Sequence, residues 1–84
     1  MKQKINIQYR AVVKKNIKIN GKQYKKGFVL IDGMFKSDVD TIISSNLCYD
    51  IIGHGDYNYF DVKKDIDILK ITETVSTKIE KIKI

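Results

Sequence analysis

Hydrophobic and polar residues alternate along the beginning of the chain, which is typical of a strand with one buried face. The alternating apolar positions are Ile5, Ile7, Tyr9, Ala11 and Val13. Ile17 and Ile19 continue the alternation, and Asn20-Gly21 follows. This dipeptide favours a tight hairpin turn, because both residues accept the positive φ angles that such a turn requires. The pattern therefore predicts a long strand over 5–13 and a short hairpin after it.

The return strand of that hairpin begins at 23–24, and Gly27 interrupts it. The apolar run 28–31 predicts another short strand, which we expect to end at a turn formed by Asp32 and Gly33. Further alternation and turn residues predict later strands over 49–52, 57–62, 66–71 and 75–84. The turns between them are expected at 53–56 and 63–65.

One segment has helical spacing instead. Its apolar positions, three or four residues apart, are Val39, Ile42, Ile43 and Leu47. We expect Ser37 to cap the helix, with Asp38 and Asp40 in the first turn, where carboxylates favour the helix dipole. The sequence thus predicts one short helix over about 37–47. Taken together, the pattern predicts a mainly β fold, a small barrel or sandwich of six to seven short antiparallel strands, in a single domain over 1–84.

Charge is distributed unevenly along the 84 residues, whose net charge is +6. Residues 1–31 carry nine basic residues and no acid. The net charge is −5 over residues 32–67 and +2 over residues 68–84. If these segments occupy different faces, the molecule is dipolar. A candidate basic patch for a partner protein or for phosphates comprises Arg10, Lys14, Lys15, Lys18, Lys22, Lys25 and Lys26. A lysine-rich surface of biased composition is the alternative, since specific nucleic-acid recognition relies more on Arg.

Cysteine and histidine usage excludes several classes. One Cys and one His give neither an internal disulfide nor a zinc site of soft ligands within one chain. No apolar run approaches a membrane span, and the start of the chain lacks the apolar stretch of a signal peptide, so no membrane partner is expected.

Catalytic and metal-binding residues are few. His54 and Asp56 lie in a glycine-flanked turn, which turn geometry alone explains. Cys48 follows the predicted helix and is expected to be packed inside, so a Cys48–His54 nucleophile pair is disfavoured. Asp65 and Asp67 would share one strand face and could hold a hard cation, but solvated acids are the favoured interpretation. We therefore expect that the protein is not an enzyme and binds no cofactor.

The aromatic residues of the second half form the other candidate site. They are Tyr49, Tyr57, Tyr59 and Phe60. Core packing, a protein interface and base stacking are the three alternatives. The neighbouring acids Asp50, Asp56 and Asp61 disfavour phosphate, so a protein partner is preferred to nucleic acid at this cluster.

A longer pattern links several of these features. It consists of a strand, the turn Asn20-Gly21-Lys22, the motif Tyr24-Lys25-Lys26-Gly27, the strand 28–31 and the helix 39–47. The run 12–49 that carries this pattern resembles a short module of small tailed-bacteriophage structural proteins. The resemblance implies a small barrel of the Src-homology type that attaches to heads, connectors or tails of virions.

Two functional hypotheses follow. The first is a non-enzymatic bacteriophage virion protein, a capsid decoration protein or a small head or tail connector component, which resides in the host cytoplasm before assembly. Its partners would be capsid or other virion proteins, with a symmetric oligomer as one form, and strands 5–13 and 79–84 are candidates for edge pairing. The alternative is a small basic phage protein that binds nucleic acid or inhibits a host factor.

Overall fold

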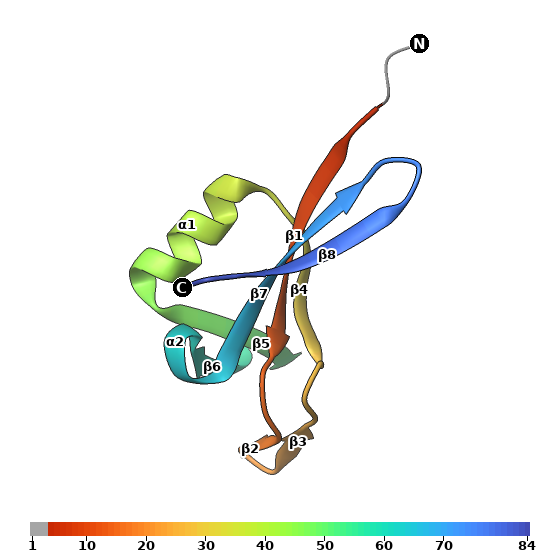
Figure 1. Ribbon diagram of the computed structural model, residues 1–84. Coiled ribbons are helices and arrows are strands. Elements are labelled where there is room, and N and C mark those ends of the chain that lie inside the picture. Colours follow the sequence, from red (N-terminus) through yellow and green to blue (C-terminus); the bar gives the residue numbers. More distant parts are fainter. Residues whose placement is uncertain (1–3) are drawn as a thin grey trace.

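The long first strand, β1 (Asn6–Val13), lies inside a four-stranded antiparallel sheet of order β4-β1-β7-β8. The computed structural model describes residues 4–84. The other strands of this sheet are β4 (Val29–Met34), β7 (Ile66–Glu73) and β8 (Thr77–Ile82). In Figure 1, β1, β7 and β8 extend together from the body of the molecule, whose longest dimension is 51 Å.

The alternation of β1 decides which face of the sheet is buried. Ala11 pairs with Ile68 and Val13 with Ile66, and all four side chains are fully buried. Because side chains alternate across a strand, the even-numbered residues of β1 point to the opposite, outer face. A strand with one buried face is therefore confirmed, except at its end, where Val12 on the outer face is also buried.

The remaining elements cover the inner face. They are β2 (Ile17–Ile19), β3 (Lys22–Tyr24), α1 (Lys36–Ser45), β5 (Leu47–Gly53), β6 (Asp56–Asp61) and α2 (Val62–Asp65). Figure 1 shows both helices and the β5–β6 hairpin on one side of the sheet. Tyr24, Val39 and Phe60 bring side chains from these elements into one apolar core with β1 and β7.

The mainly β fold class is confirmed. The arrangement is sandwich-like and does not close into a barrel. Residues 4–84 contain eight strands rather than six to seven, since β2 and β3 form a distinct hairpin of only three residues a strand. Its turn has positive φ at Asn20 (49°) and Gly21 (82°), as the Asn-Gly dipeptide predicts. None of the helices in this part of the chain is long and apolar enough to cross a membrane.

The predicted helix is shifted and shorter than expected. α1 begins at Lys36 with Phe35 as its N-cap, so the assignment of Ser37 to that position is wrong. The Asp38 carboxylate, in the first turn, accepts a hydrogen bond of 2.9 Å from the Phe35 N–H. The helix ends because Asn46 adopts the left-handed conformation, with φ of 54°, and Leu47 already belongs to β5.

Two turns expected from the sequence have other structures. The segment 63–65 belongs to α2, a single helical turn that begins where the Asp61 carboxylate accepts a hydrogen bond from the Lys64 N–H. The turn at Asp32 and Gly33 is part of β4, which continues to Met34 through irregular pairing with β1. Gly33 has φ of 69° there, so its positive φ marks an irregular position in the strand rather than a reversal of the chain.

Candidate binding surfaces

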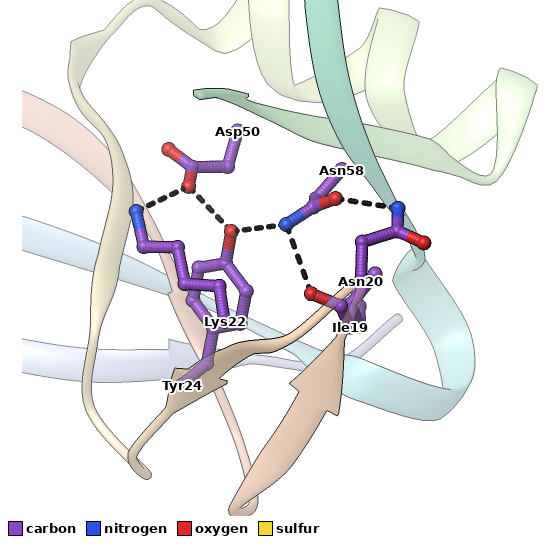
Figure 2. A network of polar contacts seen from close by, with 6 residues as sticks. All are labelled: Ile19, Asn20, Lys22, Tyr24, Asp50 and Asn58. Atoms are coloured by element: carbon purple, nitrogen blue, oxygen red, sulfur yellow. Dashed lines mark hydrogen bonds and ion pairs between the residues drawn. The ribbon is translucent and has the colours of Figure 1, made fainter. Parts of the chain in front are cut away.

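A polar network lies beneath the β5–β6 hairpin and joins it to the β2–β3 hairpin (Figure 2). Asn58 of β6 is fully buried, and its amide donates to the Tyr24 hydroxyl at 2.9 Å and to the Ile19 carbonyl at 3.3 Å. Its own oxygen accepts from Asn20 at 2.8 Å. The Tyr24 hydroxyl in turn donates to the Asp50 carboxylate at 2.5 Å. Every polar group of Asn58 is therefore satisfied, as a buried amide requires.

Charge enters this network at Asp50. Partial burial opposes ionisation of its carboxyl, but the hydrogen bonds from Tyr24 and Lys22 outweigh it and lower the pKa of Asp50. The Lys22 ammonium lies 2.9 Å from the same oxygen, and this hydrogen bond raises the pKa of Lys22. Burial, followed by the bond to Asp50, raises the pKa of the Tyr24 hydroxyl. The network thus stabilises the neutral phenol of Tyr24, the ionised carboxylate of Asp50 and the protonated amine of Lys22.

The opposite face of the same hairpin is apolar and exposed. We call it the tyrosine face, and it consists of Leu47, Tyr49, Ile51, Tyr57 and Tyr59. Tyr49 pairs with Tyr59 across the strands, and Ile51 pairs with Tyr57. The Tyr49 and Tyr57 rings lie perpendicular, with centroids 5.2 Å apart. The three tyrosines are 39–56% exposed, so aromatic surface that usually packs inside is presented to solvent here.

Phe60 does not belong to this surface. It is 1% exposed, and its ring meets Tyr24 edge-on at 5.0 Å inside the core. The prediction that groups Phe60 with the interface aromatics is therefore wrong. Its position in β6 explains why, since Phe60 alternates with Tyr57 and Tyr59 and must point to the other face of the hairpin.

Two hollows flank Tyr49, at the side of the tyrosine face nearest β4. One has a volume of about 480 Å³ and lies between Tyr49, β4 and α1. The other has a volume of about 320 Å³ and lies between Leu30, Asp50 and Ile51. Both include Ile31 and Tyr49, so the tyrosine face continues into concave, partly apolar surface. Asp32 and Asp38 line the first hollow.

Folding divides the predicted basic patch. Three of its members form ion pairs with acids of the middle segment: Arg10 with Asp32 at 2.9 Å, Lys15 with Asp65 at 3.3 Å, and Lys22 with Asp50 at 2.9 Å. Lys18, Lys25 and Lys26 are exposed and have no ion pair within residues 4–84. These ion pairs bring the basic and acidic segments together. The two segments therefore do not separate onto different faces, as a dipolar molecule would require.

A second concentration of positive charge surrounds a pocket of about 470 Å³ beside the end of β8. We call it the lysine pocket. Its basic residues are Lys14, Lys26, Lys63, Lys81 and Lys83. Ile66, Ile82 and Ile84 give it an apolar part, and Asp67 is its one acid. Lys14 donates to the Lys63 carbonyl at 2.8 Å, which ties two of its walls together.

Sequence reasoning missed three of these lysines, because Lys63, Lys81 and Lys83 lie far along the chain from Lys14. The register joins them. Val13 pairs with Ile66, and Ile68 pairs with Ile82, so the end of β8 returns to the end of β1. The alternation of Ile and Lys at the end of the chain predicted a strand with lysines on one face. Only the strand order shows that these lysines lie beside Lys14.

The weaker candidates do not assemble into sites. Cys48 is 1% exposed, and burial raises the pKa of its thiol. His54 lies at the tip of the same hairpin, about 20 Å along the strand from Cys48, so the two do not form a pair. Asp65 belongs to α2 and Asp67 to β7, so the expectation that they share a strand face is wrong. Residues 4–84 contain no cluster of three metal-ligating side chains.

Comparisons with known proteins add no assignment to these surfaces. No family model, curated protein or solved structure matches this chain.

Proposed function

We propose that this chain is a non-enzymatic structural component of a tailed-bacteriophage particle that attaches to another particle protein through its tyrosine face. The observation that carries the proposal is the exposure of Tyr49, Tyr57 and Tyr59 together on one side of the β5–β6 hairpin. The resemblance of the run 12–49 to modules of small phage structural proteins supports the particle role. Before assembly, such a protein resides in the host cytoplasm, and its partner is a capsid protein or another virion protein.

Exposed aromatic surface of this kind favours protein contacts. Tyrosine is enriched at interfaces because its ring buries a large apolar area at low conformational cost while its hydroxyl stays hydrated. Leu47 and Ile51, which are 44% and 66% exposed, extend the apolar area beyond the three rings. The tyrosine face therefore has the aromatic and aliphatic composition that is typical of interaction sites.

The polar network behind the hairpin anchors the strands that carry the tyrosine face. Asp50 and Asn58 alternate with the exposed tyrosines and are fixed by hydrogen bonds to Tyr24 and Lys22. A surface held in one conformation before binding loses less conformational entropy when a partner docks. This arrangement suits a protein that acts by shape complementarity.

The hollows beside Tyr49 indicate the chemistry of the partner. The larger hollow combines the apolar side chains of Ile31 and Ile42 with the Asp38 carboxylate and with Asp32, which is already paired with Arg10. An apolar segment that also carries Lys or Arg fits this surface, with its cation beside Asp38 or over a tyrosine ring. A phosphate backbone fits less well, because the Asp38 carboxylate repels it.

Particle composition tests this proposal. Mass spectrometry of gradient-purified particles of the phage that encodes the chain should find the 9.7 kDa protein in fixed proportion to a capsid or connector protein. The variant Tyr57→Ser/Tyr59→Ser should fold but be incorporated at least about tenfold less, as expected when two interface aromatics are lost. The matched control Ile5→Ser/Val75→Ser removes exposed apolar residues elsewhere and should be incorporated normally. A particle without this protein, or one that incorporates the tyrosine variant normally, would overturn the proposal.

The lysine pocket favours one second candidate function, which is nucleic-acid binding. Five lysines form a concave basic surface around one aspartate, which lies 3.7 Å from Lys81, and such a surface suits phosphates, whose binding releases counterions. Five phosphate contacts predict a log–log salt slope of about −4.5 for duplex DNA. Gel filtration with a nonspecific duplex should then show co-elution at about 50 mM salt and separation at about 200 mM. Independent elution at both salt concentrations excludes this second function.

A further inference from the structure

β8 is an open edge of the four-stranded sheet. It pairs with β7 in a regular register from Thr77 to Ile82, and its outer side has no neighbour within residues 4–84. Every residue from Thr77 to Lys81 is exposed. The other edge differs, because β4 has register shifts and packs against β5 and α1. A regularly paired, uncovered edge strand presents unpaired N–H and C=O groups that can accept another strand.

The residues of β8 are complementary to themselves in an antiparallel pairing centred on Ile79. In this register, Ile79 lies opposite Ile79 of a second copy. Lys78 of each copy then lies opposite Glu80 of the other, which forms two cross-strand pairs of opposite charge. Directly opposed charges of opposite sign stabilise such a pair, whereas like charges destabilise it.

The same register extends the rows of side chains that already cross the sheet. Glu80 lies opposite Lys70 in β7, so a Lys78 from the second copy places this carboxylate between two cations. On the other face, Ile71 lies opposite Ile79, which is 57% exposed. A second Ile79 beside it continues this apolar row and covers part of its exposed surface.

The position of β8 in the molecule leaves room for a second copy. β7 and β8 project with the start of β1 away from the helices and the β5–β6 hairpin (Figure 1). Because the two copies of β8 run in opposite directions, the two bodies lie at opposite ends of the paired strands.

We infer that two copies of this chain associate through β8, in the register centred on Ile79, to form one eight-stranded sheet with two-fold symmetry. The pairing does not use the tyrosine face, so it stands independently of the proposed function. Lys78 and Lys81 discourage pairing with an arbitrary strand, which is the usual protection of an exposed edge. Within one chain, Lys78 already lies 3.7 Å from the Glu80 carboxylate on the same face of β8. A second copy adds a directly opposed carboxylate to each of these lysines, whereas a partner strand without an acid at that position does not.

Charge exchange tests both the partner and the register. Because an edge of five residues makes a small interface, sedimentation velocity should cover about 20 μM to about 1 mM protein. The wild type should shift with concentration toward twice its 9.7 kDa mass. The variants Lys78→Glu and Glu80→Lys each place like charges opposite each other twice, and dimerisation of each should weaken at least about tenfold. An equimolar mixture of the two variants should dimerise again, because each supplies the charge that the other lacks.

Controls separate this register from a general effect of charge. Lys18→Glu and Asp56→Lys make the same changes of charge at exposed sites away from β8 and should dimerise as the wild type does. Circular dichroism should show that all variants are folded. A wild type that stays monomeric up to about 1 mM overturns the inference, as does a dimer that persists in both single variants or a mixture that fails to recover.

Discussion

At the scale of single residues, Asn58 joins elements that are distant in the sequence. It lies in β6, and its side chain reaches the turn residue Asn20, the Ile19 carbonyl and the Tyr24 hydroxyl. None of these groups is in its own hairpin. Buried amides that are fully hydrogen-bonded contribute modestly to stability, but their removal leaves polar partners without water or protein to bond.

Asn58→Ala should therefore lower the free energy of unfolding by about 2–3 kcal/mol, because Ile19 and Tyr24 each lose a buried partner. Urea unfolding measures the change. Asn16→Ala is the matched control, since Asn16 is exposed and accepts one bond from the Lys26 N–H, and it should cost less than about 1 kcal/mol. Equal losses in the two variants would show that the network does not support the fold.

The lowered pKa of Asp50 predicts how stability depends on acid. A carboxyl whose pKa is lower in the folded state stabilises the protein above its unfolded value, near 3.8, and this contribution is lost as the pH falls through the folded value. Between about pH 5 and pH 2, the unfolding free energy of the wild type should fall more steeply than that of Asp50→Asn, which cannot ionise. Asp32 and Asp61, whose pKa values are also lowered, are present in both proteins and cancel in the comparison. Parallel profiles would refute a role for the Asp50 charge in stability.

At the scale of elements, Asn46 connects α1 to α2. Its left-handed backbone ends α1, its carbonyl accepts from the Val62 N–H at 3.3 Å, and its side chain accepts from the Lys63 N–H at 3.0 Å. Asparagine suits this position because it tolerates positive φ and also offers a side-chain acceptor.

Asn46→Ala should destabilise the fold by about 1–2 kcal/mol, since alanine has no acceptor and is strained at positive φ. Asn46→Gly should cost less, because glycine loses only the bond to Lys63 and adopts this backbone freely. Thermal unfolding of the two variants shows whether the side-chain hydrogen bond to Lys63 or the tolerance of positive φ contributes more to stability. If glycine costs as much as alanine, the side-chain bond matters more than the backbone conformation.

The elements also show how far the sequence predicts the fold. Alternation located β1 and β6, because one face of each is buried over part of its length. The expected strands over 49–52 and 66–71 correspond to β5 and β7. The β2–β3 turn was predictable because Asn-Gly has a specific backbone requirement. Alternation in β6 also assigned Phe60 to the face opposite Tyr57 and Tyr59, but burial of the polar residue Asn58 on that face hid which side was the core. α2 was not predictable from spacing, since a single turn depends on the Asp61 cap.

At the scale of the whole molecule, folding brings together basic and acidic residues that lie in separate segments of the sequence. Arg10, Lys15 and Lys22 each contact an acid from the middle segment, so three of the nine basic residues of the first segment are paired with acids on folding. The lysine pocket instead collects residues from both ends of the chain. Of the two candidate sites, the tyrosine face is local to one hairpin and was largely predictable, whereas the lysine pocket depends on strand order, which composition does not encode.

The two surfaces lie on different elements, and their roles should be separable by mutation. Tyr57→Ser/Tyr59→Ser should reduce incorporation into particles, whereas Lys26→Glu/Lys83→Glu should leave incorporation unchanged and abolish any co-elution with duplex DNA at low salt. All four side chains are exposed and outside the core, so each double variant should unfold within about 1 kcal/mol of the wild type.

Competition between the variants in one infected culture makes the comparison quantitative, since both proteins meet the same particles. Mass spectrometry of the purified particles gives the ratio of each variant to wild type. If the lysine variant is excluded as strongly as the tyrosine variant, the contact extends beyond the β5–β6 hairpin to the end of β8, and the partner must then carry an acidic surface beside its apolar one. If only the tyrosine variant is excluded, the apolar face alone determines attachment, and the positive charge of the lysine pocket remains available for a phosphate-bearing partner.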